Sequence, residues 1–163
     1  MRFVKVERRD EPRGYFLSAA KYREQLPGLQ AELPPGAWAF ASNSDHYDFY
    51  SERCVKDLKL VDLNVAEEPS GTSIVIQFSF NNIAPEQLVI RYTAVSTLVV
   101  DVEMNGVGEG SGSNPVHQLG PVQLDEIVPH RHGCEHEIKL IGGTIRVVCA
   151  DLNASWVARV NLE

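Results

Sequence analysis

The sequence predicts an α+β fold that is mainly β, with about six to eight mostly antiparallel strands and an N-terminal helix. Beyond Cys54, apolar residues recur with a period of two, which is typical of strands with one buried face. The first fifty residues differ, because strong helix formers and prolines replace this alternation. With 163 residues, 44% of them hydrophobic, we expect one domain in which residues 1–50 pack on a β-rich core of residues 54–163.

The N-terminal segment is expected to hold a short edge strand and two helices. Residues 3–6 read "FVKV", and a helix of two to three turns should follow from Ser18, a possible N-cap, to Pro27–Gly28. Its apolar residues only roughly form one face, so this helix should lie on the sheet. A short helix near Trp38 and a polar, aromatic-rich loop should come next.

The clearest single strand is "SIVIQFSF", which places Ile74, Ile76, Phe78 and Phe80 on one face. Alternation shifts phase in the preceding run, and a bulge near Leu60 would reconcile the two halves. Residues 88–102 form either two strands or one long bent strand. Sheet, sandwich and partial barrel are all compatible with this order of strands.

The strongest local signal is a hairpin over residues 135–150, with Gly142–Gly143 in its turn. We expect these glycines to supply the positive φ angles of a two-residue turn. Residues 105–118, which include four glycines, should form a flexible loop within the sheet. The loop lacks the lysine and the spacing of phosphate-binding motifs, so nucleotide binding is not expected.

Charge and cysteine content limit the function classes. Lys and Arg number 15 against 22 Asp and Glu, and the formal net charge of −7 would repel nucleic acid and anionic lipid. No signal-peptide core or membrane span is present in the sequence. The three cysteines lack a paired spacing, so we expect reduced thiols and a cytoplasmic location.

Histidines cluster in "PHRHGCEHEI", where His130, His132 and His136 lie at alternate positions. His130 and His132 could offer two imidazoles to one ion, and His136, Cys134 or Glu137 could add a third ligand if Gly133 bends the chain; such a donor set favours zinc. The alternatives are an exposed hairpin loop with solvated histidines, or a pH-responsive surface. The metal site is the less favoured of these interpretations.

The stretch "HRHGCEHE" also resembles the first motif of the cupin family, in which HxH is followed by a glutamate, here Glu137. This resemblance implies a metal held inside a β-barrel and an oxygenase, isomerase or binding role. It covers eight residues. The family's second motif, with a Pro-Gly turn and a further histidine, is missing because no histidine follows His136.

The segment "SNSDHYDFYSERC", residues 42–54, combines aromatic and charged residues. Two interpretations are open: a partner-binding loop, since such residues suit interface anchors, or an aromatic staple that packs the N-terminal segment on the sheet. Cys54 has Arg53 and Lys56 nearby, which would lower its pKa. The carboxylates Asp101, Glu103, Asp125 and Glu126 are expected at solvated strand edges rather than in acid–base pairs.

The order of strands over residues 54–157, with phrases such as "IRYTAVSTL" and "VVCADLNASW", resembles small β-rich bacterial proteins, some of them grouped with immunity proteins of toxin systems. The resemblance implies a cytoplasmic, non-enzymatic protein that binds another protein, and the acidic balance suits a basic toxin. The alternative is a metal-binding protein or metal-dependent enzyme with ligands in residues 130–137. Homo-oligomerisation through unpaired strand edges is a third possibility.

Overall fold

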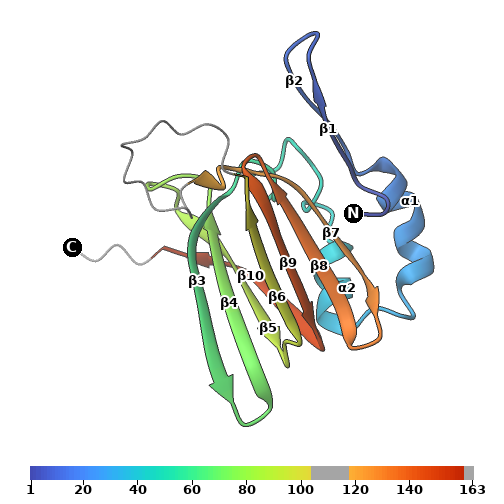
Figure 1. Ribbon diagram of the computed structural model, residues 1–163, viewed down its shortest axis with the longest axis vertical. Helices are drawn as coiled ribbons and strands as arrows, with labels where there is room; N and C mark the ends of the chain where they lie inside the picture. The colour runs from blue at the N-terminus through green and yellow to red at the C-terminus, as the bar shows by residue number, and fades with distance from the viewer. Residues whose placement is uncertain (104–117, 160–163) are drawn as a thin grey trace.

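A computed structural model describes residues 1–103 and 118–159 (Figure 1). Its elements are β1 (Lys5–Arg9), β2 (Gly14–Ser18), α1 (Ala20–Leu29), α2 (Pro35–Ala41), β3 (Lys59–Glu68), β4 (Gly71–Ser79), β5 (Glu86–Thr93), β6 (Thr97–Val102), β7 (Val122–His130), β8 (Gly133–Leu140), β9 (Gly143–Cys149) and β10 (Asp151–Ala158). The predicted flexible loop at 105–118 lies outside the described residues, apart from Gln118.

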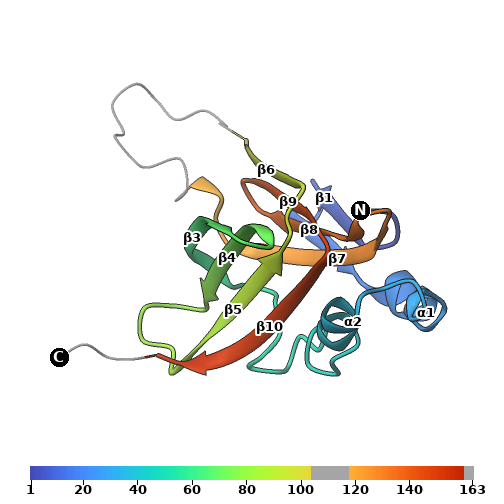
Figure 2. The same ribbon diagram turned by 90° about the horizontal axis from the view of Figure 1, so that it is seen from below.

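Eight of the strands form two four-stranded antiparallel sheets, with orders β10-β5-β4-β3 and β6-β9-β8-β7 (Figures 1 and 2). The chain passes from one sheet to the other at a shared corner, between β5 and β6 and again between β9 and β10. Backbone bonds from Ala150 N–H to Thr93 (3.0 Å) and from Ser96 N–H to Val148 (2.9 Å) close this corner. The α+β, mainly β prediction is confirmed, and the ten strands exceed the six to eight expected.

The hydrophobic core lies between the inner faces of these sheets and extends under the helices. The alternation seen in the sequence sets these faces, because every second side chain of a strand points inward. Fully buried members of the core include Ile74, Ile76 and Phe78 of β4, Leu88, Ile90 and Tyr92 of β5, Ile138 and Leu140 of β8, and Ile145 and Val147 of β9.

Two finer expectations for the strands are met. The register between β3 and β4 shifts between Leu60 and Asp62, which is the predicted bulge. Residues 88–102 contribute to two strands, β5 and β6, and Ala94 between them has a φ of 46°. The chain therefore breaks at this corner and changes sheet.

The hairpin of β8 and β9 is confirmed, but the expected role of its glycines is wrong. Positive φ angles occur at other glycines of the chain and not at Gly142 or Gly143. A Cβ atom at Gly142 would lie 2.0 Å from the carbonyl oxygen of Gln118, and one at Gly143 would lie 2.1 Å from that of Asp101. Close backbone approach, rather than turn geometry, requires glycine at both positions.

Both predicted helices are present with shifted ends. Helix α1 begins after Ala19, and Ser18 Oγ accepts only a 3.3 Å bond from the Ala20 N–H. It runs through Pro27 and packs on β7, where the Tyr22 hydroxyl donates to the Ile127 carbonyl at 2.5 Å. No helix among the described residues has the length and apolar character needed to cross a membrane.

Helix α2 is fixed to the first sheet by Asp151 of β10. The Asp151 carboxylate accepts bonds from the N–H groups of Gly36 (3.1 Å) and Ala37 (2.9 Å), which lack partners within the helix. A Cβ atom at Gly36 would lie 1.9 Å from the Leu152 carbonyl oxygen. Glycine at this position therefore lets α2 pack directly on β10.

The N-terminal strand begins at Lys5 rather than at residue 3, and it pairs with β2, which the sequence did not predict. The β1–β2 hairpin projects away from the two sheets (Figure 1). Residues before it are held by Glu126 of β7, whose carboxylate accepts bonds from the N–H groups of Arg2, Phe3 and Val4 at 2.5–2.7 Å. The hairpin is thus anchored at its base and open to solvent beyond it.

Candidate functional site

The aromatic-rich loop of residues 42–58 divides into an inner and an outer part. His46 and Tyr47 are buried, whereas Phe49 is 46% exposed and Tyr50 is 99% exposed. The inner pair packs under Phe40 and Tyr22, with ring centroids 4.2 Å apart for Phe40–His46 and 5.6 Å apart for Tyr22–Tyr47. The two interpretations of this segment are therefore compatible: its inner residues form a staple, and its outer aromatic residues face solvent.

His46 holds the loop to the second sheet through one bond and to helix α2 through another. Its Nε2 atom lies 2.7 Å from Oδ1 of Asp125 on β7, and its Nδ1 atom lies 2.9 Å from the Phe40 carbonyl oxygen. Both partners are acceptors, and an imidazole that carries both protons can donate to each of them. His46 and Asp125 then constitute a buried ion pair between the loop and β7.

Asp125 extends this contact to the first sheet. Its Oδ2 atom accepts a bond from Nε2 of His136 on β8 at 2.8 Å, and Nδ1 of His136 lies 2.8 Å from the Tyr92 hydroxyl on β5. Burial acts to raise the pKa of Asp125, but the charge of His46 and the bonds from both imidazoles outweigh burial and hold that pKa well below its usual range. We call this set, His46, Asp125, His136 and Tyr92, the buried polar network.

The buried polar network has the residue types of an acid–base site but not the access. His136 and Tyr92 have no exposed surface, and His46 and Asp125 are each 1% exposed. The void beside Asp125 and His136 has a volume of about 10 Å³, which is hardly room for one water molecule. The network therefore connects three parts of the fold and cannot receive a substrate from solvent in this conformation.

Further bonds fix the loop to β7. The Tyr47 hydroxyl donates to the Asp125 carbonyl at 3.1 Å, and the Val55 N–H donates to the His46 carbonyl at 3.3 Å. At the end of the loop, the Asp57 N–H donates to the Val122 carbonyl at 2.8 Å. The loop is thus held along its length to β7.

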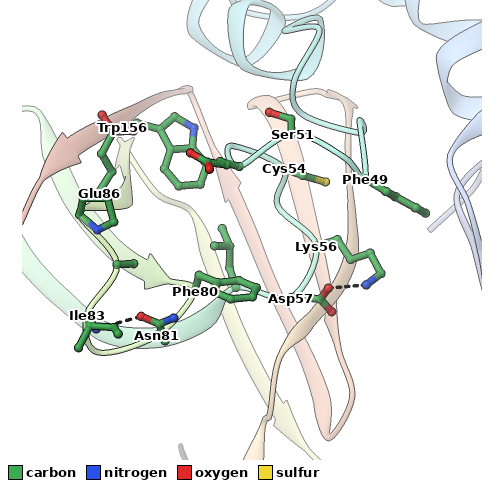
Figure 3. Close-up of a pocket in the computed structure, with 14 residues that line it drawn as sticks. Phe49, Ser51, Cys54, Lys56, Asp57, Phe80, Asn81, Ile83, Glu86 and Trp156 are labelled. Atoms are coloured by element: carbon green, nitrogen blue, oxygen red, sulfur yellow. Dashed lines mark hydrogen bonds and ion pairs between the residues drawn. The ribbon is translucent and has the colours of Figure 1, made fainter.

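A cleft of about 490 Å³ opens beside this loop (Figure 3). We call it the aromatic cleft; it is formed by loop residues 49–58, the β4–β5 turn at residues 80–86, and Trp156 of β10. Figure 3 shows Phe80 in the middle of the cleft, between Trp156 and the Lys56–Asp57 pair. Its size falls in the range that accommodates a ligand or a protruding side chain.

Phe80 lies at the surface and not in the core, where the sequence predicted it. The sequence places it on the buried face with Ile74, Ile76 and Phe78, but β4 ends at Ser79 and Phe80 is 57% exposed. Ile83, in the turn that follows, is 89% exposed. Large apolar side chains that remain exposed around a concave surface are a mark of interaction sites.

Charged groups surround the cleft and are arranged in pairs. The Arg53 guanidinium donates two bonds to the Glu86 carboxylate, at 3.0 and 2.9 Å, and so joins the loop to the β4–β5 turn. Lys56 pairs with the adjacent Asp57 at 2.5 Å. Three carboxylates line the cleft, Glu52, Asp57 and Glu86, against Lys56 and the Arg53 that is bonded to Glu86, so the cleft carries a small excess of negative charge.

Cys54 lies beneath the cleft and does not have the character of a nucleophile. It is 5% exposed, and its Sγ donates to the His46 carbonyl at 3.3 Å. Burial is the largest influence on its pKa and raises it, which outweighs the lowering by Lys56. The expected lowering of this pKa is therefore wrong.

The three candidate zinc ligands do not come together. His136 points into the interior and uses both ring nitrogens in the buried polar network. His130 and His132 lie at the β7–β8 turn, with their rings stacked at 5.4 Å. No group of three or more His, Cys, Asp or Glu side chains in residues 1–103 and 118–159 is placed to bind a metal. Zinc binding itself stays a prediction.

Several residues that were expected at the surface near the histidines are buried instead. Cys134 on β8 is fully buried rather than at the surface, and its Sγ atom lies 3.6 Å from Sγ of Cys149 on β9. Asp125 and Glu126 were expected at a solvated edge, yet both are buried with partners. Asp101 and Glu103 fit that expectation: Asp101 is exposed on the edge strand β6, and the exposed Glu103 pairs with Lys139 at 3.0 Å.

Comparison with protein-family models, curated proteins and solved structures finds no match to this chain.

Proposed function

We propose that this protein is a non-catalytic protein-binding protein that recognises its partner through the aromatic cleft. The observation that supports the proposal most directly is that Phe80 and Ile83 are exposed at a concave surface. The buried polar network holds the loop that forms one side of this surface. Large apolar side chains at a rigid, concave site are suited to bind an apolar anchor of a partner.

Charge indicates the chemistry of that partner. The cleft carries three carboxylates against Lys56 and Arg53, and the whole chain has a formal net charge of −7. A partner segment with Lys or Arg beside its apolar anchor would be attracted and oriented by this field. A basic toxin bound in an immunity-type complex is one partner of this kind, and we propose it as the biological setting.

The buried polar network supports a binding role over catalysis. Its groups hold the cleft loop in one conformation, because His46 connects the loop to Asp125, and Asp125 connects it to His136. A preorganised loop loses little conformational entropy when it binds a partner. His46, Asp125 and His136, which have the residue types for acid–base chemistry, therefore serve to hold the cleft loop in place.

A displayed library of random peptides tests the proposal. We expect selected peptides to combine an aromatic or aliphatic residue with Lys or Arg, and Ile83→Asp should weaken their binding by about tenfold or more. Val65→Asp, at a 52% exposed position on β3, is the matched control and should bind as the unaltered protein does. Failure to enrich any peptide, or equal binding by Ile83→Asp, would contradict the proposal.

A further inference from the structure

Within residues 1–103 and 118–159, the sheet of the β1–β2 hairpin contains only these two strands, so both of its edges are unpaired there. An isolated two-stranded hairpin is marginally stable in water, and its unpaired N–H and C=O groups can pair with another strand. The hairpin also projects from the body, so both of its strands can be reached (Figure 1). Each of the two edges could therefore pair with a further strand.

The two edges differ sharply in charge. Strand β1 reads "KVERR", and four of its five side chains are charged, a feature that protects an edge from pairing. Strand β2 reads "GYFLS" and carries no charge. Tyr15 is 42% exposed and Phe16 is 36% exposed, and no proline or lysine interrupts the strand. Edge β2 is therefore open to pairing in a way that β1 is not.

From this contrast we infer that β2 pairs with β2 of a second copy of the chain, in an antiparallel, twofold-symmetric arrangement. Full overlap of the five residues places Phe16 opposite its own copy, Tyr15 opposite Leu17, and Gly14 opposite Ser18. Aromatic and aliphatic cross-strand pairs of this type are stabilising, and a twofold contact requires that the surface be complementary to itself.

The same operation on β1 would be repulsive. Full overlap would place Lys5 opposite Arg9 and Glu7 opposite its own copy, and like charges directly opposite one another are destabilising. Charge thus selects β2 as the self-pairing edge and leaves β1 on the outside. The result is a four-stranded sheet, β1-β2-β2-β1, that joins two bodies and leaves the aromatic cleft of each outside the contact.

Light scattering after size exclusion, over a wide concentration range, tests this inference. We expect the mass to rise from 18.1 kDa towards twice that value. Phe16→Lys should raise the dissociation constant by about tenfold or more, because it removes an aromatic pair and places like charges opposite each other. Val99→Lys, at a 38% exposed position on the edge strand β6, is the matched control and should leave the mass unchanged.

Amide hydrogen exchange locates the contact. Residues 14–18 should become protected as the protein concentration rises, and the same residues of Phe16→Lys should exchange rapidly at every concentration. A mass of one chain at all concentrations would overturn the inference, as would a dimer that persists in Phe16→Lys but dissociates in Val99→Lys. The test involves no partner protein, so its failure would leave the proposed function of the cleft intact.

Discussion

The Nε2 atom of His46 lies 2.7 Å from Oδ1 of Asp125, although 79 residues separate them in the chain. This contact joins the cleft loop to β7, and both side chains are shielded from solvent. The position of the aromatic cleft thus depends on an ion pair in the core.

Replacement of Asp125 by Asn tests the strength of this connection. The variant keeps the size of the side chain but removes the carboxylate charge that lies 2.7 Å from Nε2 of the buried His46. Loss of one member of a buried pair costs about 3–5 kcal/mol, so we expect the free energy of unfolding to fall by about that amount. Urea denaturation measures it, and a loss of less than about 1 kcal/mol would show that the pair contributes little.

Acid should remove the same contribution. The pKa of Asp125 is lower in the folded chain than its ordinary value of 3.8, so the unfolded chain binds more protons near that pH and stability rises with pH there. The contribution is present above about pH 4 and is lost as the pH falls towards the folded pKa. The stability difference between the unaltered protein and Asp125→Asn should therefore shrink below about pH 4; a constant difference would contradict the assignment.

The three histidines of the zinc hypothesis should behave differently when each is changed to alanine. His136→Ala leaves Oδ2 of Asp125 and the Tyr92 hydroxyl without their partner in the core, and we expect a loss of about 3 kcal/mol. His130→Ala and His132→Ala lie at a turn and should each change stability by about 0.5 kcal/mol or less. Thermal unfolding with and without added zinc compares all three, and equal effects would argue for a shared site.

Gln123 on β7 offers a stabilising change. It is 4% exposed, and neither atom of its amide has a hydrogen-bond partner among the described residues. An unsatisfied buried polar group costs about 1–3 kcal/mol, so Gln123→Leu should raise the free energy of unfolding by about 1 kcal/mol. A clear destabilisation in urea would show that the amide has a partner, such as a buried water.

Local patterns predicted much of the fold and little of the site. Alternation from Ile74 to Phe78, the phase shift at Leu60 and the hairpin over residues 135–150 each depend on neighbouring residues, and each was confirmed. The buried polar network joins positions 46, 92, 125 and 136 through tertiary packing, which no spacing in the chain reveals. Phe80 belongs to the cleft because β4 ends one residue earlier, and strand ends are poorly marked in a sequence.

The two tryptophans provide the most direct test of the central claim, that the aromatic cleft is the binding surface. Trp156 lines this cleft, and Trp38 lines a separate hollow beside α1, so it is an internal control. In a titration with a selected peptide followed by nitrogen–proton NMR, the indole signal of Trp156 should shift and that of Trp38 should stay in place. A shift confined to Trp38, or a peptide that binds without moving Trp156, would contradict the account.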